Sequence, residues 1–152
     1  MKDGALFVGE PNARTWNEGA LLGFAADVLT DTDRSRLSIA SLDAWLRLPI
    51  RLGQIAFVFG ERGLPLAFAT WAYVSRRTAG RLASGGPPHP EEWNDGDLLW
   101  IVDVVAPHGN LRELLGALRR GPGANRENAA ARRRRGSGSM RTVSLARSDR
   151  TS

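Results

Sequence analysis

An aspartate inside an apolar run is the residue of this chain best placed to do chemistry. Asp103 stands within LLWIVDVVAP. Burying a carboxylate is costly unless it is paired or hydrogen-bonded. Asp103 is therefore either a strand-end residue that binds backbone amides or a carboxylate that orients or charges a catalytic partner. His108 follows five residues later and is the histidine closer to it, whereas His89 is interpreted as a solvated loop residue.

Most standard catalytic and binding signatures are missing from the sequence. It contains no phosphate-cradling GxxxxGK[ST], no GxSxG nucleophile elbow and no histidine pair at metal-ligand spacing. The absence of cysteine excludes disulfides, thiolate metal sites and a cysteine nucleophile, and it fits a cytoplasmic location. No signal-peptide layout opens the chain, and no segment approaches the roughly 18 apolar residues of a membrane span. We therefore predict no metal, no bound cofactor and no membrane span.

The elements that would position Asp103 and His108 follow from hydrophobic periodicity. Apolar residues at helical spacing predict a helix over 18–29 with Asn17 as N-cap, and a second from about 37 that Pro49 should end or kink. The remaining predicted elements alternate between strands and helices: strands 54–59, 65–75 and 97–105, and helices 76–83 and 111–118. Residues 97–105 form the most apolar run, which predicts a central strand. The order predicts an α/β (α+β) fold around one sheet.

Charge and composition divide the chain into three parts. Residues 1–16 have little pattern and are predicted to be loosely ordered, and 17–120 form one domain. Residues 121–152 are rich in Arg, Gly and Ser and are predicted to be a disordered basic C-terminal tail. The run of arginines at 132–135 could bind an anionic surface or nucleic acid. Because it lacks interleaved aromatic residues, a disordered tail is the preferred interpretation.

A set of tryptophan, glycine, proline and acidic residues recurs in a specific order along the middle of the chain. Its members are Thr70-Trp71-Ala72, Trp93, Gly96-Asp97, Trp100, Asp103, Ala106-Pro107 and Gly109. Over roughly residues 20–120 this pattern resembles the RTX toxin-activating lysine acyltransferases of the hemolysin-activating type. The resemblance implies a GNAT-like single domain with a mostly antiparallel mixed sheet flanked by helices. It also implies transfer of a fatty acyl group from acyl carrier protein to an internal lysine of an RTX protoxin, which activates the toxin.

The resemblance assigns two catalytic positions, an aspartate and a histidine. The aspartate falls on Asp103, whereas an ungapped match from Leu22-Gly23 places the histidine position on Ser35. Serine is a poor base at neutral pH, unlike histidine. Two interpretations stay open: an enzyme in which Asp103 acts with His108 as a substitute base, and a catalytically degenerate member that binds the carrier protein or the toxin. A nucleic-acid binder, the third hypothesis, rests only on the tail.

The implied partners are acyl carrier protein, as donor substrate, and an RTX protoxin. Carrier proteins are acidic, so a docking surface for one should be positive. The sequence offers Arg76, Arg77 and Arg81 as a donor-docking cluster, with a solvated helix face as the alternative. Family members usually continue past the last helix with a strand-forming stretch, where this chain has its Arg/Gly/Ser-rich tail. A homodimer is left open.

Overall fold

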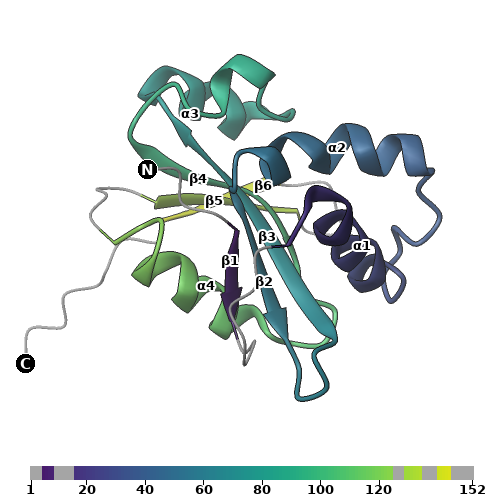
Figure 1. Cartoon of the computed structure of the whole chain (residues 1–152). Coiled ribbons are helices and arrows are strands. Elements are labelled where there is room, and N and C mark those ends of the chain that lie inside the picture. The colour runs from purple at the N-terminus through teal and green to yellow at the C-terminus, as the bar shows by residue number, and fades with distance from the viewer. Residues whose placement is uncertain (1–4, 9–15, 125–128, 135–139, 145–152) are drawn as a thin grey trace, which may run out of the picture.

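The computed structural model describes residues 5–8, 16–124, 129–134 and 140–144. Its centre is one six-stranded sheet in the order β1-β2-β3-β4-β5-β6 (Figure 1). The strands are β1 Leu6–Val8, β2 Ile55–Phe59, β3 Pro65–Val74, β4 Leu98–Val105, β5 Ala129–Arg134 and β6 Met140–Ser144. The β1–β2 and β4–β5 pairs are parallel, and the other three pairs are antiparallel. The predicted mixed, mostly antiparallel sheet is confirmed.

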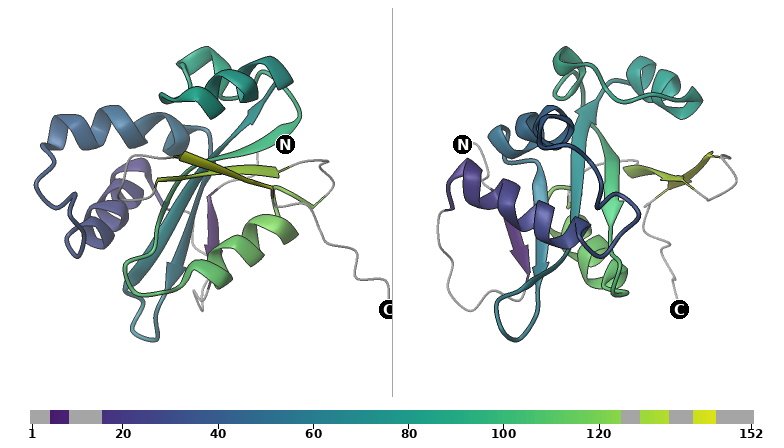
Figure 2. Two further views of the ribbon diagram at one scale, coloured as in Figure 1. Left: turned by 180° about the vertical axis from the view of Figure 1, so that it is seen from behind. Right: turned by 90° about the vertical axis from the view of Figure 1, so that its right-hand side faces the viewer.

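Helices cover both faces of the sheet, as the views in Figure 2 show. They are α1 Glu18–Leu29, α2 Ile39–Arg51, α3 Arg76–Ser84 and α4 Leu111–Arg120, with a short 3₁₀ turn, η1, at Pro90–Glu92. Buried residues of α1 and α2 pack on Phe57 and Phe68, and Leu82 of α3 packs on Ala72 and Val74. Leu114 and Leu118 of α4 pack on the opposite side of the same strands. This α/β architecture is consistent with the single GNAT-like domain that the resemblance implied.

Local sequence signals explain where the first two helices begin. Asn17 accepts a hydrogen bond from the backbone N–H of Ala20 at 2.8 Å, so the predicted N-cap is confirmed. Ser38 caps α2 in the same way through the N–H of Ser41. Pro49 does not end α2, which runs on to Arg51. A proline close to the C-terminus removes a single backbone donor, which the helix tolerates there.

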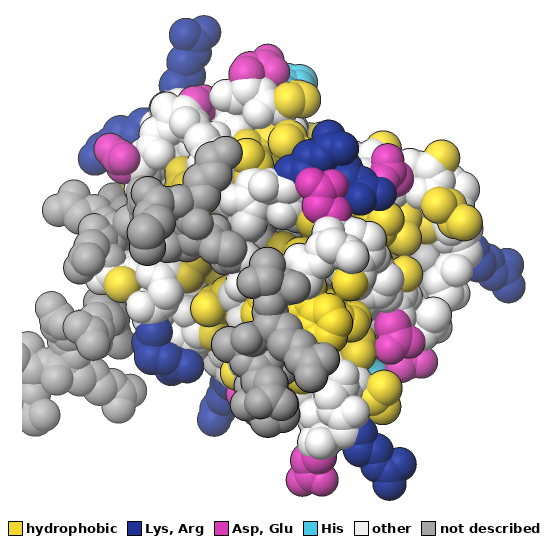
Figure 3. All heavy atoms as spheres, viewed as in Figure 1, with side chains coloured by type: hydrophobic (Ala, Val, Ile, Leu, Met, Phe, Trp, Pro, Cys, Tyr) yellow, Lys and Arg dark blue, Asp and Glu magenta, His cyan; other side chains and the backbone are white. Residues whose placement is uncertain are grey.

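Ion pairs tie α1 to α2. Glu18 of α1 lies 3.5 Å from Arg47 and 3.3 Å from Arg51, and Arg47 also pairs with Asp43 one turn earlier. Figure 3 shows basic and acidic side chains against each other where the two helices meet. The contacts join the start of α1 to the end of α2, away from the turn that connects the two helices.

Three short strands differ from the sequence prediction. β1 lies within the part expected to be loosely ordered, and β5 and β6 lie within 121–152, expected to be a disordered tail. Composition misses them because their backbone groups are satisfied by pairing with strands far along the chain. Leu6–Val8 pairs with β2, and residues 129–131 pair with 99–101 of β4. Such non-local pairing overrides local propensity.

Candidate functional site

A β-bulge aims Asp103 at the helical layer. The register pairs Thr70 with Asp103 but Trp71 with Ile101, so Val102 is an extra residue in β4. Before the bulge, Leu99 and Ile101 face α4, and after it Val105 packs in the cluster formed with α1 and α2. Without the extra residue the alternation of the strand would turn Asp103 towards α4. Bulges often re-aim a side chain in this way.

Arg34, in the turn between α1 and α2, binds the Asp103 carboxylate. Its Nη1 lies 2.8 Å from Asp103 Oδ2. The guanidinium also lies over the ring of Trp45, with Cζ 5.0 Å from the ring centroid. The Thr32 hydroxyl holds the turn in place, because it donates to the carbonyl of Leu29 at 2.8 Å and accepts from the N–H of Arg34 at 3.1 Å. Asp103 is thus a paired, half-buried carboxylate.

Ser35, on which the sequence resemblance placed the histidine position, is exposed beside this contact. Its backbone N–H donates to the carbonyl of Thr32 at 3.3 Å. The neighbouring Arg34, which the sequence did not single out, is the residue of this turn that reaches Asp103. An arginine among polar turn residues carries no signal of such a contact, because the contact depends on how the turn meets β4.

His108 reaches the same turn from the loop after β4. Its Nε2 lies 3.0 Å from Asp31 Oδ2, and both side chains are about half exposed (48% and 58%). Asp31 and Arg34 are three residues apart in one tight turn, so the partners of both, His108 and Asp103, lie close to the same stretch of chain. A histidine oriented by a carboxylate is an arrangement that suits a general base. The structure therefore brings Asp103, Ser35 and His108 to one turn.

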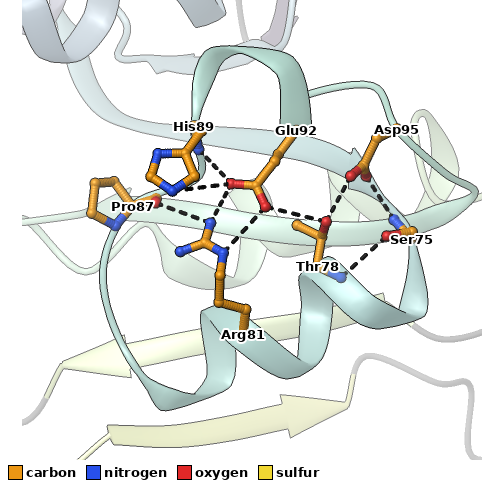
Figure 4. Close-up of polar contacts among 7 residues, drawn as sticks. All are labelled: Ser75, Thr78, Arg81, Pro87, His89, Glu92 and Asp95. Carbon is orange, nitrogen blue, oxygen red and sulfur yellow. Dashed lines mark hydrogen bonds and ion pairs between the residues drawn. The ribbon is translucent and has the colours of Figure 1, made fainter.

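The predicted docking arginines separate into two exposed residues and one that is already engaged. Arg76 and Arg77 are exposed at the start of α3. Arg81 instead donates two hydrogen bonds to the Glu92 carboxylate (Figure 4). Its Nε lies 3.2 Å from Oε2, and its Nη2 binds Oε1. In the same cluster Asp95 accepts from the Thr78 hydroxyl at 2.6 Å and from the N–H of Ser75 at 2.7 Å. Arg81 therefore ties α3 to the loop that precedes β4.

Glu92 gives this cluster a pH dependence. The backbone N–H of His89 and then the Arg81 guanidinium favour its carboxylate, and together they hold the pKa of Glu92 below its ordinary value despite desolvation. A carboxyl whose folded pKa is lowered stabilises the fold above its unfolded pKa, about 4.3. That stability is lost as the pH falls through the folded value.

We expect Glu92→Gln to lower the melting temperature by a constant amount between about pH 5 and pH 7. The difference from the native chain should close as the pH falls below about 4.3. Circular dichroism melts across this range measure it. Glu91→Gln, at the exposed neighbouring position, is the matched control and should change little at any pH. A melting difference that stays constant down to pH 3 would contradict the assignment.

In the described residues no three His, Asp or Glu side chains gather as a metal site would require. Nor does any helix of the described part have the length and apolar character needed to cross a membrane.

Comparison with known proteins places these residues in a family. The model of the RTX toxin acyltransferase family (HlyC) matches residues 14–147, which extends beyond the 20–120 of the sequence resemblance and takes in β5 and β6. The lysine-acyltransferase RtxC of Vibrio cholerae serotype O1 is 38% identical over 80 residues, which are 50% of this chain and 52% of RtxC.

Two leukotoxin-activating lysine-acyltransferases are also similar. LtxC of Aggregatibacter actinomycetemcomitans is 31% identical over 96 residues, 62% of this chain and 56% of LtxC. LktC serotype A1 of Mannheimia haemolytica is 37% identical over 51 residues, 33% of this chain and 30% of LktC. The chain thus spans about half the length, or less, of these curated relatives. The family match itself covers most of the chain, so the chain belongs to the RTX toxin acyltransferase family.

Proposed function

We propose that this protein is a protein-lysine N-acyltransferase. It takes a fatty acyl group from the thioester of acyl carrier protein and places it on the ε-amine of an internal lysine of an RTX protoxin. Family membership and the activity for which the similar proteins are named support this proposal. One structural observation carries it for this chain: Asp103, at the family's aspartate position, holds a cationic group at 2.8 Å. A lysine ammonium carries the same charge.

The acceptor amine must lose a proton before it can attack. Its ordinary pKa is near 10.4, so only about one amine in 2,500 is neutral at pH 7. In the proposed reaction Asp103 binds the ammonium and a base accepts one of its protons. The amine nitrogen then attacks the thioester carbon, the C–S bond breaks, and the carrier thiolate leaves. The thiolate takes up the second proton, which the nitrogen loses as the amide forms. A positioned base contributes roughly 10²–10⁴ in rate.

His108 is the base that we propose for this step. The Asp31 carboxylate accepts a hydrogen bond from His108 Nε2–H, which favours the tautomer with its proton on Nε2. In that tautomer Nδ1 carries a lone pair that can take a proton. We expect His108→Gln to lower the transfer rate by about a hundredfold. The measurement is transfer of labelled acyl groups from carrier protein to protoxin. His89→Gln, in the loop that precedes η1, is the control and should keep native activity; equal losses in both variants would contradict the assignment of His108.

We propose that the acyl group of the donor binds beside the last residues of β4, on the side that faces β5. β4 continues to Val105 after its last pairing with β5 at Ile101, and β5 continues to Arg134 after Ala131 (Figure 2, right). Two parallel strands that part leave backbone donors and acceptors for an extended ligand. The acyl carrier would dock on Arg76 and Arg77. We place the reaction in the cytoplasm, which suits a chain without cysteine.

A non-catalytic binding module is the second candidate. It is favoured by the exposed serine at the histidine position and by the pairing of Asp103 with Arg34. The transfer assay separates the two, with Ser35→His beside the native chain and Ser84→His as a control histidine at the far end of α3. Transfer by the native chain supports the enzyme. Transfer by Ser35→His alone identifies a scaffold without a base. No transfer by either, with carrier protein still bound, identifies the binding module.

A further inference from the structure

The guanidinium of Arg34 is held on two sides. Asp103 Oδ2 lies 2.8 Å from Nη1, and the ring of Trp45 lies beneath Cζ at 5.0 Å. Trp45 is itself set by Phe68 of β3, with the ring centroids 6.0 Å apart. The Arg34 side chain is 33% exposed and that of Asp103 is 21% exposed. The carboxylate and the ring face are thus partly shielded from water and together hold one cation.

A carboxylate beside an aromatic face is a recognition site for organic cations. The ring's negative face attracts ammonium as well as guanidinium groups, and the carboxylate adds a charge-assisted hydrogen bond. Arginine is a fitting internal occupant, because its guanidinium keeps its proton throughout the physiological range. It can therefore fill the site of a lysine ammonium without itself becoming a nucleophile.

We propose that Trp45 and Asp103 form the subsite for the acceptor lysine, and that Arg34 is an internal occupant which the substrate must displace. The inference rests on the proposed function and deepens it, because it names how the acceptor is recognised. In this proposal Trp45 of α2 binds the acceptor ammonium through its ring face. Arg34 competes with that ammonium for Asp103.

The surroundings of Arg34 allow this exchange. The backbone of the turn is fixed by Thr32, which binds the N–H of Arg34 and the carbonyl of Leu29. The side chain can therefore leave Asp103 while the turn keeps its shape. Partly exposed ion pairs are weak, because water competes for both partners. When the site is free in only a fraction of molecules, the apparent affinity for a ligand falls by that fraction.

The test is binding of n-butylammonium, which carries the charge and stem of a lysine side chain. Its titration is followed by the NMR signal of the Trp45 indole N–H, assigned by its loss in Trp45→Phe. We expect Arg34→Gln to bind the amine about tenfold more tightly than the native chain. Arg36→Gln, at an exposed arginine of the same turn, is the matched control and should bind as the native chain does. Arg34→Lys should also bind as the native chain does, because it restores a cation.

Two double variants test the site itself. Adding Asp103→Asn to Arg34→Gln should remove the gain in affinity. Adding Trp45→Leu should also remove it; because the indole signal is then lost, binding to this variant is followed by the NMR signals of n-butylammonium itself. A thermal melt confirms that each variant is folded, and Arg34→Ala replaces Arg34→Gln if the glutamine variant is not. No gain in the folded single variant, or a gain that survives Asp103→Asn, would overturn the proposal. Tighter amine binding with no acyl transfer by any variant would leave the cation subsite standing and overturn the proposed function. Acyl transfer by the native chain, with no tighter amine binding by Arg34→Gln, would support the proposed function and overturn the cation subsite.

Discussion

Asp103→Asn should lower acyl transfer by about a thousandfold at neutral pH. Asparagine keeps the shape of the side chain and can still accept one hydrogen bond, but it carries no charge with which to bind an ammonium. The loss should appear as a fall in kcat/KM for the protoxin, with binding of the carrier protein unchanged. Labelled acyl transfer at varied protoxin concentration, together with a carrier-protein titration, measures both quantities.

Loss of folding does not explain such a result. The Arg34–Asp103 pair is partly exposed, and pairs of this kind contribute about 1 kcal/mol or less. The melting temperature of Asp103→Asn should therefore lie within a few degrees of the native value. Asp33→Asn removes an exposed carboxylate from the same turn and should keep native activity. If Asp103→Asn retains activity within tenfold of the native chain, Asp103 does not bind the reacting amine.

The regular elements of this fold could be predicted because their signals are local. Asn17 before an apolar helical stripe marks the start of α1, and the sequence also predicts the β2–β3 hairpin and the apolar strand β4. Asp103 could be singled out because an aspartate is rare in such an apolar run. These inferences depend on residues within a few positions of one another.

The parts of the site that escaped prediction depend on contacts between distant segments. The bulge at Val102, which decides the face on which Asp103 lies, exists only in the pairing of β4 with β3. The contact of Arg34 with Asp103 spans 69 positions of sequence, and that of His108 with Asp31 spans 77. The spacing of apolar residues along the sequence does not predict contacts between side chains so far apart. The strands β5 and β6 were missed for the same reason, since a stretch rich in Arg, Gly and Ser becomes a strand here through its pairing.

Gly96→Ala should be among the most destabilising single changes in this domain. The loop before β4 packs so tightly on the end of β3 that a Cβ at Gly96 would lie 2.4 Å from the backbone nitrogen of Ser75 and 2.4 Å from the carbonyl of Val74. Neither backbone atom can move alone. The N–H of Gly96 binds the carbonyl of Tyr73, and Trp93 accepts at its carbonyl from the N–H of Tyr73 and from the buried Gln54 side chain. This close approach explains why a glycine stands at position 96, between Trp93 and Asp97.

Overpacking of this kind costs about 2–4 kcal/mol, which for a domain of this size is a fall in melting temperature of about 10 °C. A thermal or urea melt followed by circular dichroism measures it. Gly80→Ala is the matched control, because a Cβ there meets no atom within 4 Å and the position lies in helix α3. That variant should be as stable as the native chain or more so, since alanine is the better helix former. Equal melting of the two variants would mean that the loop before β4 does not rest on β3. The polar cluster around Thr78, which joins α3 to the same loop, would then not be built as described.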